Sequence, residues 1–326
     1  MLVADLEGNS STLILNPAAG GVAALLSSLT RAARERGMGV RALEAGEDVR
    51  SAAVEVADGG AGSLAVAGGD GSVAAVAGVA VERGLPIVVV PAGTLNHFAR
   101  DLGLDLIRPL RALDVFAAGQ RERRVDVGRV NGRLFINNVS LGLYAEMLGD
   151  PGYREDKLRV AQAKLQAVFS NPELRHALRI TPPDEAPLES LVAVVVSNNP
   201  YEFARWEQFG QRHRLDTGTL QISVLDASTL YELEKLLAGT LLGAIEFRPA
   251  LRHWLSERLE TGVLGEKVRA GIDGEPITLE APLRFEVEPG ALRVLVPEGS
   301  PESNQVPPLE AGWHAARALR RWLHPS

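Results

Sequence analysis

The strongest chemical signal in the sequence is a glycine-rich turn, Gly68-Gly69-Asp70-Gly71-Ser72, between a predicted strand and a predicted helix. Glycines let the backbone turn tightly and approach phosphate oxygens, and the N–H groups at a helix start attract an anion. Ser72 adds a hydroxyl group. Asp70 is unexpected beside phosphates unless it works with a cation or holds the loop. A plain strand-to-helix turn also uses glycine, but we favour phosphate binding.

Two further segments carry polar groups that suit phosphoryl chemistry. Pro91-Ala92-Gly93-Thr94-Leu95-Asn96 follows the next predicted strand, and its Thr94 and Asn96 are able to hydrogen-bond a ribose or a phosphate. Helix capping is the alternative role for these two side chains. Gly271-Ile272-Asp273-Gly274-Glu275 ends a later strand. An Asp in such a place usually makes a plain turn, but a kinase needs a carboxylate to deprotonate the attacking hydroxyl.

Composition excludes several classes of protein. The chain has 326 residues, no cysteine and six histidines without HExxH spacing, which rules out disulfide frameworks and thiolate zinc sites and argues against a histidine-built zinc site. The net charge of −7 argues against a broad nucleic-acid-binding surface. No GxxxxGK[ST] motif occurs. The GxGxxA match at Gly69–Ala74 lacks an acid about 20 residues later, which disfavours a dinucleotide-binding dehydrogenase.

The elements of the first 120 residues alternate between strand and helix, which predicts a parallel sheet covered on both faces. Ligands of such sheets bind at the carboxyl ends of the strands, and Asn16, Gly68–Gly71 and Gly93–Asn96 all fall there. The predicted strands are 11–16, 39–43, 63–67 and 86–90, and the predicted helices are 22–37, 48–57, 72–83 and a stretch that ends at Arg100.

From about Arg121 the pattern changes to a strand-rich, antiparallel part. Its predicted strands are 123–130, 134–138, 191–196, 219–225, 267–272, 283–288 and 291–296, and its predicted helices are 156–169, 230–245 and 249–259. We therefore expect an α/β nucleotide-binding domain over 1–122 and a β-rich substrate domain over 123–296. Residues 297–308 form a linker, and an amphipathic helix over 311–323 is predicted to return to the first domain, so that 297–326 packs on it.

Taken together, these motifs resemble the diacylglycerol kinase catalytic-domain family, which includes bacterial lipid kinases and sphingosine kinases. The resemblance runs from about Thr12 to Val296, and four motifs in the same order and spacing make it specific. The motifs are Asn16-Pro17-Ala18-Ala19-Gly20, Gly68-Gly69-Asp70-Gly71-Ser72, Pro91-Ala92-Gly93-Thr94-Leu95-Asn96 and Asp273-Gly274-Glu275, joined by Val125-Asp126-Val127-Gly128 and Asn138-Val139-Ser140-Leu141-Gly142.

This resemblance implies a two-domain fold like that of NAD kinase and diacylglycerol kinase, with the active site in the cleft between the domains. It implies ATP and Mg²⁺ as cofactors and transfer of phosphate to a lipid hydroxyl, with diacylglycerol as the default substrate. Asp273 is implied as the general base, and Asp70 is a competing candidate for that role. The residues implied to contact ATP are Asn16, Gly68, Gly69, Asp70, Gly71, Ser72, Gly93, Thr94 and Asn96.

The chain departs from the family pattern at two notable positions. The common Asn-Asp-Phe is Asn96-His97-Phe98 here, which removes one carboxylate. The common Asp-Asp-Gly, linked to a structural Mg²⁺, is Asp216-Thr217-Gly218, so Asp216 is the remaining metal candidate. A kinase of a soluble substrate such as NAD and a non-catalytic nucleotide or lipid sensor are the alternative functions.

The expected location is the cytoplasm, with peripheral contact at the inner face of the membrane where a lipid substrate lies. Residues 1–11 contain no Lys or Arg and do not resemble a secretory signal. The longest apolar runs are also much shorter than the roughly 18 residues that span a bilayer. Apart from the lipid, the resemblance suggests a second copy of the chain as a partner, and no nucleic acid.

Overall fold

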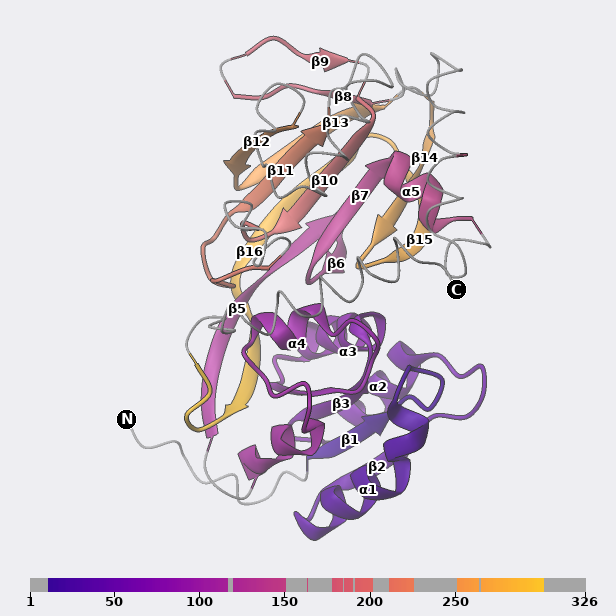
Figure 1. The fold of residues 1–326 in the computed structure, drawn as a ribbon, viewed down its shortest axis with the longest axis vertical. Helices are drawn as coiled ribbons and strands as arrows, with labels where there is room; N and C mark the ends of the chain where they lie inside the picture. Colours follow the sequence, from indigo (N-terminus) through magenta and orange to yellow (C-terminus); the bar gives the residue numbers. More distant parts are fainter. Residues whose placement is uncertain are drawn as a thin grey trace, which may run out of the picture. The chain divides into compact units, whose positions relative to one another are not determined.

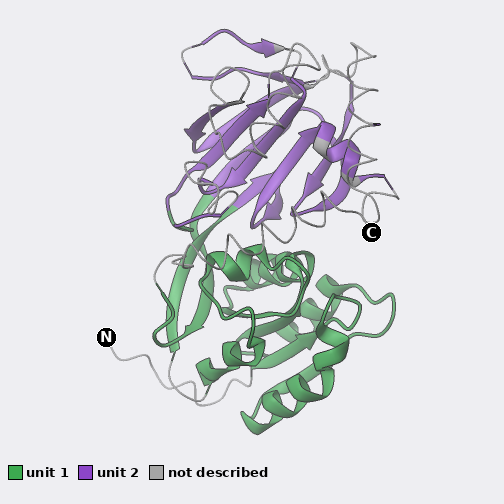
Figure 2. Ribbon diagram, in the orientation of Figure 1, with its two compact units in different colours: residues 1–127, 214–216, 288–304 green, residues 128–213, 217–287, 305–326 purple. Residues whose placement is uncertain are grey.

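The computed structural model describes residues 11–116, 120–150, 163, 178–183, 185–189, 191–201, 211–225, 251–263 and 265–301 of the chain. The chain divides into two compact units, which Figure 2 colours separately. Unit 1 comprises residues 1–127, 214–216 and 288–304, and unit 2 comprises residues 128–213, 217–287 and 305–326. Two long strands, β5 (Gln120–Val130) and β16 (Leu283–Pro297), contribute residues to both units.

Unit 1 is built on a parallel sheet in which the strands lie in the order β2, β1, β3, β4, and Figure 1 labels the first three of them. β16 continues this sheet beyond β4, where Val294 pairs with Ile87 in the parallel direction. The three central strands are almost wholly apolar because both faces of a parallel sheet are buried. The strand bounds are β1 (Thr12–Leu15), β2 (Gly39–Ala42), β3 (Leu64–Gly68) and β4 (Ile87–Pro91).

Helices cover both faces of this sheet. Leu13 and Leu15 face a core shared with α1 and the 3₁₀ helix η1. The alternate residues Ile14 and Val66 are fully buried on the opposite face, where α2 and α3 pack against each other and against β3. The predicted doubly covered parallel sheet is therefore confirmed. The helices are α1 (Val22–Glu35), α2 (Val49–Asp58), α3 (Asp70–Arg83), α4 (His97–Asp101) and η1 (Pro109–Phe116).

Unit 2 contains a six-stranded sheet in the order β12, β11, β10, β7, β14, β15, and its neighbouring strands are antiparallel. The antiparallel, β-rich second part predicted from the sequence is thus confirmed. The strand bounds are β7 (Asn138–Gly142), β10 (Ala193–Asn198), β11 (Leu220–Leu225), β12 (Leu251–Ser256), β14 (Lys267–Ile272) and β15 (Glu275–Glu280).

The core of unit 2 lies between this sheet and a second layer of strands. Val139, Val194 and Ile222 from the six-stranded sheet pack in one buried cluster with Phe135 and Phe285 from the second layer. The apolar members of this cluster occupy alternate positions along β10 and β11, which is the pattern of a sheet with one face in the core. The second layer comprises β5, β6 (Arg133–Phe135), β8 (Leu178–Ile180), β9 (Leu188–Glu189), β13 (Arg258–Val263) and β16. The short helix α5 (Leu143–Leu148) packs against β7 and β14 of the six-stranded sheet.

Three sequence-based assignments in this part were wrong. The helix predicted over 249–259 is two strands, because β12 pairs with β11 and β13 pairs with β16. The single strand predicted over 134–138 breaks after Phe135, and β7 starts at Asn138. The two strands predicted over 283–288 and 291–296 form the one strand β16.

Several predicted elements lie outside the described residues. These are the helix at 230–245, nearly all of the helix at 156–169, the end of the linker and the amphipathic helix at 311–323. In the part of the chain that is described, no helix is long and apolar enough to cross a membrane.

Candidate functional site

The carboxyl ends of β1, β3 and β4 bring three predicted site segments to one edge of the sheet in unit 1. Leu15 pairs with Ala67, and Gly68 pairs with Pro91, so the segments that follow these strands start side by side. The backbone N–H of Asn16 donates to the carbonyl of Ala67 at 3.2 Å. We call this edge, formed by residues 16–21, 68–72 and 91–96, the phosphate edge.

Glycine is required where the loops of the phosphate edge touch. A Cβ on Gly93 would lie 2.3 Å from the Cα of Gly69, and a Cβ on Gly68 would lie 2.6 Å from the Cβ of Ser72. Both distances are far below van der Waals contact between carbon atoms, which is about 3.5–4.0 Å. The loops therefore pack backbone against backbone. This close packing, together with the first N–H groups of α3, is suited to holding an anion.

Three of the predicted ATP contacts use their side chains to shape these loops. The Asn16 Nδ2 donates to the Ser72 Oγ at 2.9 Å, which ties the first loop to α3. Asn96 adopts a left-handed backbone, and its side chain exchanges two hydrogen bonds of 2.8 Å with the backbone of Gly93. Thr94, between them, is exposed. Of the predicted polar side chains, Thr94 is thus the one that faces solvent.

Asp70 lies in the first turn of α3 and connects this helix to α4. Its Oδ2 accepts the backbone N–H of His97, and its Oδ1 accepts that of Phe98, both at 3.1 Å. The Asp70 carboxylate lies at the N-terminal ends of both α3 and α4, and the positive end of each helix dipole favours its negative charge. The His97 ring itself lies 3.1 Å from the Arg100 guanidinium, measured from Nδ1 to Nη2. Asp70 therefore holds the loop, one of the two roles considered from its sequence context.

Asp273 occupies a two-residue hairpin turn in unit 2, between β14 and β15. Asp273 and Gly274 have φ values of +49° and +89°. A type I′ turn needs positive φ at both central residues, and Asp-Gly is a favoured pair for it. Ile272 of β14 pairs with Val139 of β7, so the turn lies at the start of β7. This register explains how Asp273 reaches residues 136–138, far away in sequence.

The carboxylate of Asp273 is anchored by three consecutive backbone amides. Its Oδ2 accepts the N–H of Ile136 at 2.9 Å, and its Oδ1 accepts those of Asn137 at 2.7 Å and Asn138 at 3.0 Å. A carboxylate offers about four lone-pair positions, so these bonds leave one for another partner. The break between β6 and β7 has the same origin, because the amides of 136–138 point to Asp273.

The environment of Asp273 raises its pKa from 3.8 to about 6. Desolvation of the carboxylate is the largest cause, and the three amide bonds and the positive charge of Arg212 partly offset it. The residue nevertheless keeps partial exposure to solvent. At neutral pH such a group is ionised and is a stronger base than an ordinary aspartate, which suits proton abstraction.

Arg212 was not singled out from the sequence. Its side chain is fully buried in unit 2, and its Nη1 donates to the carbonyl of Ile136 at 2.6 Å. In the sequence it stands in a polar run, Gln211-Arg212-His213-Arg214, that looks like solvated loop. No local pattern distinguishes its burial from the exposure of Arg214.

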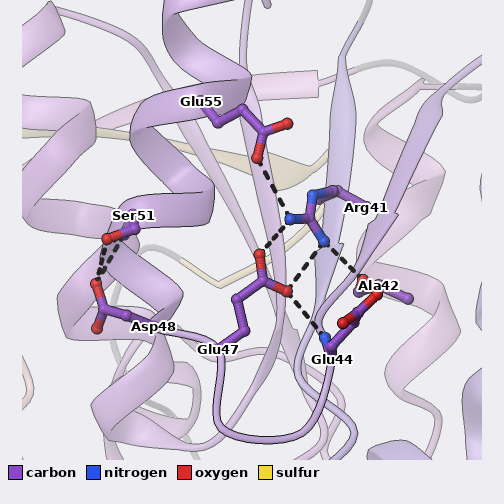
Figure 3. Close-up of polar contacts among 7 residues, drawn as sticks. All are labelled: Arg41, Ala42, Glu44, Glu47, Asp48, Ser51 and Glu55. Atoms are coloured by element: carbon purple, nitrogen blue, oxygen red, sulfur yellow. Dashed lines mark hydrogen bonds and ion pairs between the residues drawn. The ribbon is translucent and has the colours of Figure 1, made fainter.

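A charged cluster at the end of β2, adjoining the phosphate edge, was also missed (Figure 3). The Arg41 guanidinium binds both carboxylate oxygens of Glu47 and lies 3.3 Å from Glu55. Glu47 also accepts the backbone N–H of Glu44 at 2.9 Å. This amide bond, and then Arg41, lower the pKa of Glu47. Asp48 caps α2 by accepting the N–H of Ser51, so the cluster fixes the loop between β2 and α2.

Asp216, the metal candidate, lies in the segment 214–216 of unit 1. Its Oδ1 accepts from the Arg214 Nε at 2.9 Å, and both side chains are more than half exposed. In the described part of the chain no three His, Asp or Glu side chains form a group fit to hold a metal ion. The assignment of Asp216 to a metal stays a prediction.

Comparison with known proteins assigns the chain to a family. The model of the diacylglycerol kinase catalytic domain matches residues 10–130. A Pseudomonas aeruginosa protein named probable lipid kinase YegS-like is 32% identical over 302 residues, which cover 88% of this chain and 93% of that protein. This chain belongs to the diacylglycerol kinase family of lipid kinases. A Bacillus subtilis protein of this family, named diacylglycerol kinase, is 28% identical over 224 residues, 65% of this chain and 70% of its own length.

Solved structures support the family fold. A crystal structure described as a putative diacylglycerol kinase from Bacillus anthracis superposes with a TM-score of 0.68 at 21% identity. The match covers 91% of this chain and 100% of that one. The fold class expected from the sequence, an α/β part joined to a β-rich part as in diacylglycerol kinases, is confirmed.

Proposed function

We propose that this lipid kinase transfers the γ-phosphoryl group of ATP to a lipid hydroxyl, with diacylglycerol as its substrate. The observation that carries the proposal is the state of Asp273, a carboxylate held by three amides with a pKa raised to about 6. A turn that served only the hairpin would need no such carboxylate. The family and the glycine loops of the phosphate edge support the same function.

In this proposal the phosphate edge of unit 1 binds the nucleotide. The amides at the start of α3 and the closely packed backbones of Gly69 and Gly93 receive the phosphate oxygens. Asn16, Ser72 and Asn96 keep these loops in place through their side-chain bonds. Phosphoryl transfer relies mainly on positioning and charge neutralisation, so rigid loops contribute directly to rate.

Asp273 acts as the general base toward the lipid hydroxyl. It accepts the hydroxyl proton as the oxygen attacks the γ-phosphorus, the bond to the β-phosphate oxygen breaks, and ADP leaves. General-base assistance is typically worth about 10²–10⁴-fold. The proposal requires that the nucleotide and the activated hydroxyl meet in line during turnover.

The residues of the phosphate edge fit a magnesium ion that arrives with the nucleotide. Mg²⁺ is commonly held by one or two carboxylates, by waters and by substrate phosphates. Asp70 is the carboxylate that the phosphate edge offers, and each of its oxygens accepts one backbone amide. When bound, the ion neutralises charge on the phosphates.

The test is a phosphorylation assay on the purified full chain. It combines γ-labelled ATP and MgCl₂ with vesicles that contain diacylglycerol, and parallel samples contain a sphingoid base, a ceramide, phosphatidylglycerol, NAD or no acceptor. We expect label in phosphatidic acid. Label in another lipid would support lipid kinase activity but would identify a substrate other than diacylglycerol. Label in NAD alone, or nucleotide binding without transfer to any acceptor, contradicts the proposal.

We also propose contact with a membrane surface, because the lipid hydroxyl lies there. Two large apolar side chains of unit 1 support it, Ile107 with 81% and Leu95 with 59% of its surface exposed. Residues 311–323 supply a second candidate contact in the sequence. Co-sedimentation with anionic vesicles compares the full chain, a chain ending at Val306 and an Ile107→Ser variant. Weaker vesicle binding by one of the two variants would place the membrane contact in the region that this variant changes. Failure of the full chain to bind vesicles would contradict the proposed membrane contact.

A further inference from the structure

The buried guanidinium of Arg212 donates hydrogen bonds to three neutral oxygens. Its Nη1 donates to the carbonyls of Ile136 at 2.6 Å and Asn198 at 2.9 Å, and its Nη2 donates to the Asn137 Oδ1 at 2.6 Å. A cation that is fully removed from water is costly unless its hydrogen bonds are made and an opposite charge is near. The hydrogen bonds that hold this cation therefore also fix the groups that accept them.

Two of these three oxygens belong to the residues that anchor Asp273. Ile136 and Asn137 present oxygens to Arg212 and backbone N–H groups to the Asp273 carboxylate. The segment 136–138 is thus held between a cation on one side and an anion on the other. Hydrogen bonds arranged in such a chain polarise one another, which strengthens the amide bonds to the carboxylate.

The third residue of the segment is held by Tyr201. Its hydroxyl accepts from the Asn138 Nδ2 at 2.9 Å, and its ring centre lies 5.8 Å from the Arg212 Cζ, within cation–π range. Asn198 adds a bond from its Nδ2 to the Ile136 carbonyl at 3.3 Å. Every residue of 136–138 is therefore connected to Arg212 directly or through one side chain.

We propose that Arg212 is a positioning residue for Asp273, which fixes the segment 136–138 and through it the orientation of the carboxylate toward the lipid hydroxyl. This inference rests on the proposed function. Arg212 acts on the carboxylate through the segment 136–138.

The charge of Arg212 has a second effect that can be measured separately. It lowers the pKa of Asp273 and so works against desolvation. Of the described residues, the charged side chain next to the turn in the sequence is Glu275 at the start of β15, and it is exposed. Loss of the cation should therefore raise the pKa of Asp273 further, whereas loss of the guanidinium shape alone should not.

The test compares Arg212→Met, which removes the charge, with Arg212→Lys, which keeps a charge but loses the planar fork. The control is Arg269→Met, because Arg269 lies in β14, the strand that leads to Asp273, and is 66% exposed in a pair with Glu146. We expect Arg212→Met to lower kcat roughly ten- to hundredfold with little change in the KM for ATP. The acid limb of its kcat/KM profile should move to higher pH. Arg212→Lys should lower kcat but leave the acid limb at the wild-type pH. The control, Arg269→Met, should match the wild type in both kcat and the position of the limb.

Wild-type kcat in Arg212→Met overturns the proposal. So does a loss of activity that equals the loss of folded protein, with the acid limb unmoved. If Arg212→Met fails to fold, Asn137→Ala serves instead, because it removes one acceptor of Arg212 and leaves the backbone N–H and the cation. It should lower kcat without moving the limb, and unchanged kcat overturns the proposal.

A substrate-free measurement separates this inference from the proposed function. Carboxyl ¹³C chemical shifts follow the titration of Asp273 in the wild type and in Arg212→Lys and Arg212→Met. A midpoint that rises in Arg212→Met alone supports the coupling even if no lipid is phosphorylated. Identical midpoints in all three proteins overturn it, whatever the kinase assay shows.

Discussion

Asp70 in unit 1 and Asp273 in unit 2 both receive backbone N–H groups from a segment distant in the sequence. Asp70 receives two, from the first turn of α4, and Asp273 receives three, from the segment between β6 and β7. The donors of Asp70 belong to the short helix α4, which directly follows the phosphate edge in the sequence. Behind the donors of Asp273 lies the buried guanidinium of Arg212.

The comparison shows that the surroundings of an anchored carboxylate decide its chemistry. Asp70 joins the first turns of α3 and α4, and we propose that its charge holds the loops of the phosphate edge. Desolvation brings the pKa of Asp273 to about 6, and its fixed orientation leaves about one lone-pair position for a proton. We therefore propose Asp273 as the base and Asp70 as the residue that holds the loop, and the following variants test that division.

The largest effect is expected from Asp273→Asn. Asn131-Gly132 forms an equivalent left-handed turn in this chain, with φ of +47° and +80°, so asparagine suits the backbone of the hairpin. The new amide would still lose one of the three anchoring bonds, because its Nδ2 is a donor and cannot accept the N–H that the Asp273 Oδ2 accepts. The amide has no basic oxygen, and we expect kcat to fall at least about a hundredfold, or roughly 3 kcal/mol of barrier. ATP affinity, measured by calorimetry, should stay within a factor of about two. Retained turnover would transfer the role of base to Asp70 or another group.

Asp70→Asn should weaken nucleotide binding before it affects chemistry. The substitution replaces the carboxylate that accepts two backbone N–H groups with a neutral amide. A hydrogen bond to a charged group is worth about 1.5–3 kcal/mol, so α4 should separate from α3. We expect the Kd for ATP to rise about tenfold or more, with a smaller fall in kcat at saturating ATP. A kcat that collapses while ATP still binds normally would reverse the assignment of the two acids.

The packing of the phosphate edge is tested by a pair of glycine variants. The Cβ of Gly93→Ala would lie 2.3 Å from the Gly69 Cα, whereas the Cβ of Gly69→Ala would lie 3.6 Å from the Gly93 Cα. We expect Gly93→Ala to lower the unfolding free energy by about 1–3 kcal/mol and Gly69→Ala to lower it little. Denaturant unfolding of both variants measures the difference in unfolding free energy. Equal unfolding free energies would show that the two loops can move apart without cost.

The smallest effect is expected from Glu47→Gln in the cluster of Figure 3. Glu47 also accepts a backbone N–H, but it lies beside Arg41 near the surface and its pKa is lowered. We expect unchanged kcat at pH 7 and a small drop in the thermal midpoint. A strong loss of turnover would mean that an amide-anchored acid outside the two compared here takes part in the reaction.

Most of the phosphate edge was predictable from the sequence because its signals are local. Gly68–Ser72 follows an apolar strand directly, and parallel strands place their carboxyl ends along one edge. The turn at Asp273 was equally predictable, because Asp273-Gly274 is a favoured turn sequence. Their assignment to the chemistry came from the family resemblance.

The remaining features depend on pairing between distant residues. Leu251, Trp254 and Leu255 have helical spacing, but pairing with β11 makes Leu251–Ser256 a strand. Arg212 is buried because Ile136 and Asn198 place carbonyls around it after the sheet forms. Neither partner is near Arg212 in sequence, so a local pattern gives no sign of this site.

The pH dependence of kcat/KM for the lipid tests the central claim most directly. The claim is that the anchored carboxylate of Asp273 is the base, so activity should fall as pH drops through about 6, where this carboxylate takes up a proton. We predict one acid limb near pH 6 in the wild type and its loss from the residual activity of Asp273→Asn. A limb that persists in Asp273→Asn, or a wild-type profile flat from pH 5 to 8, would contradict the account.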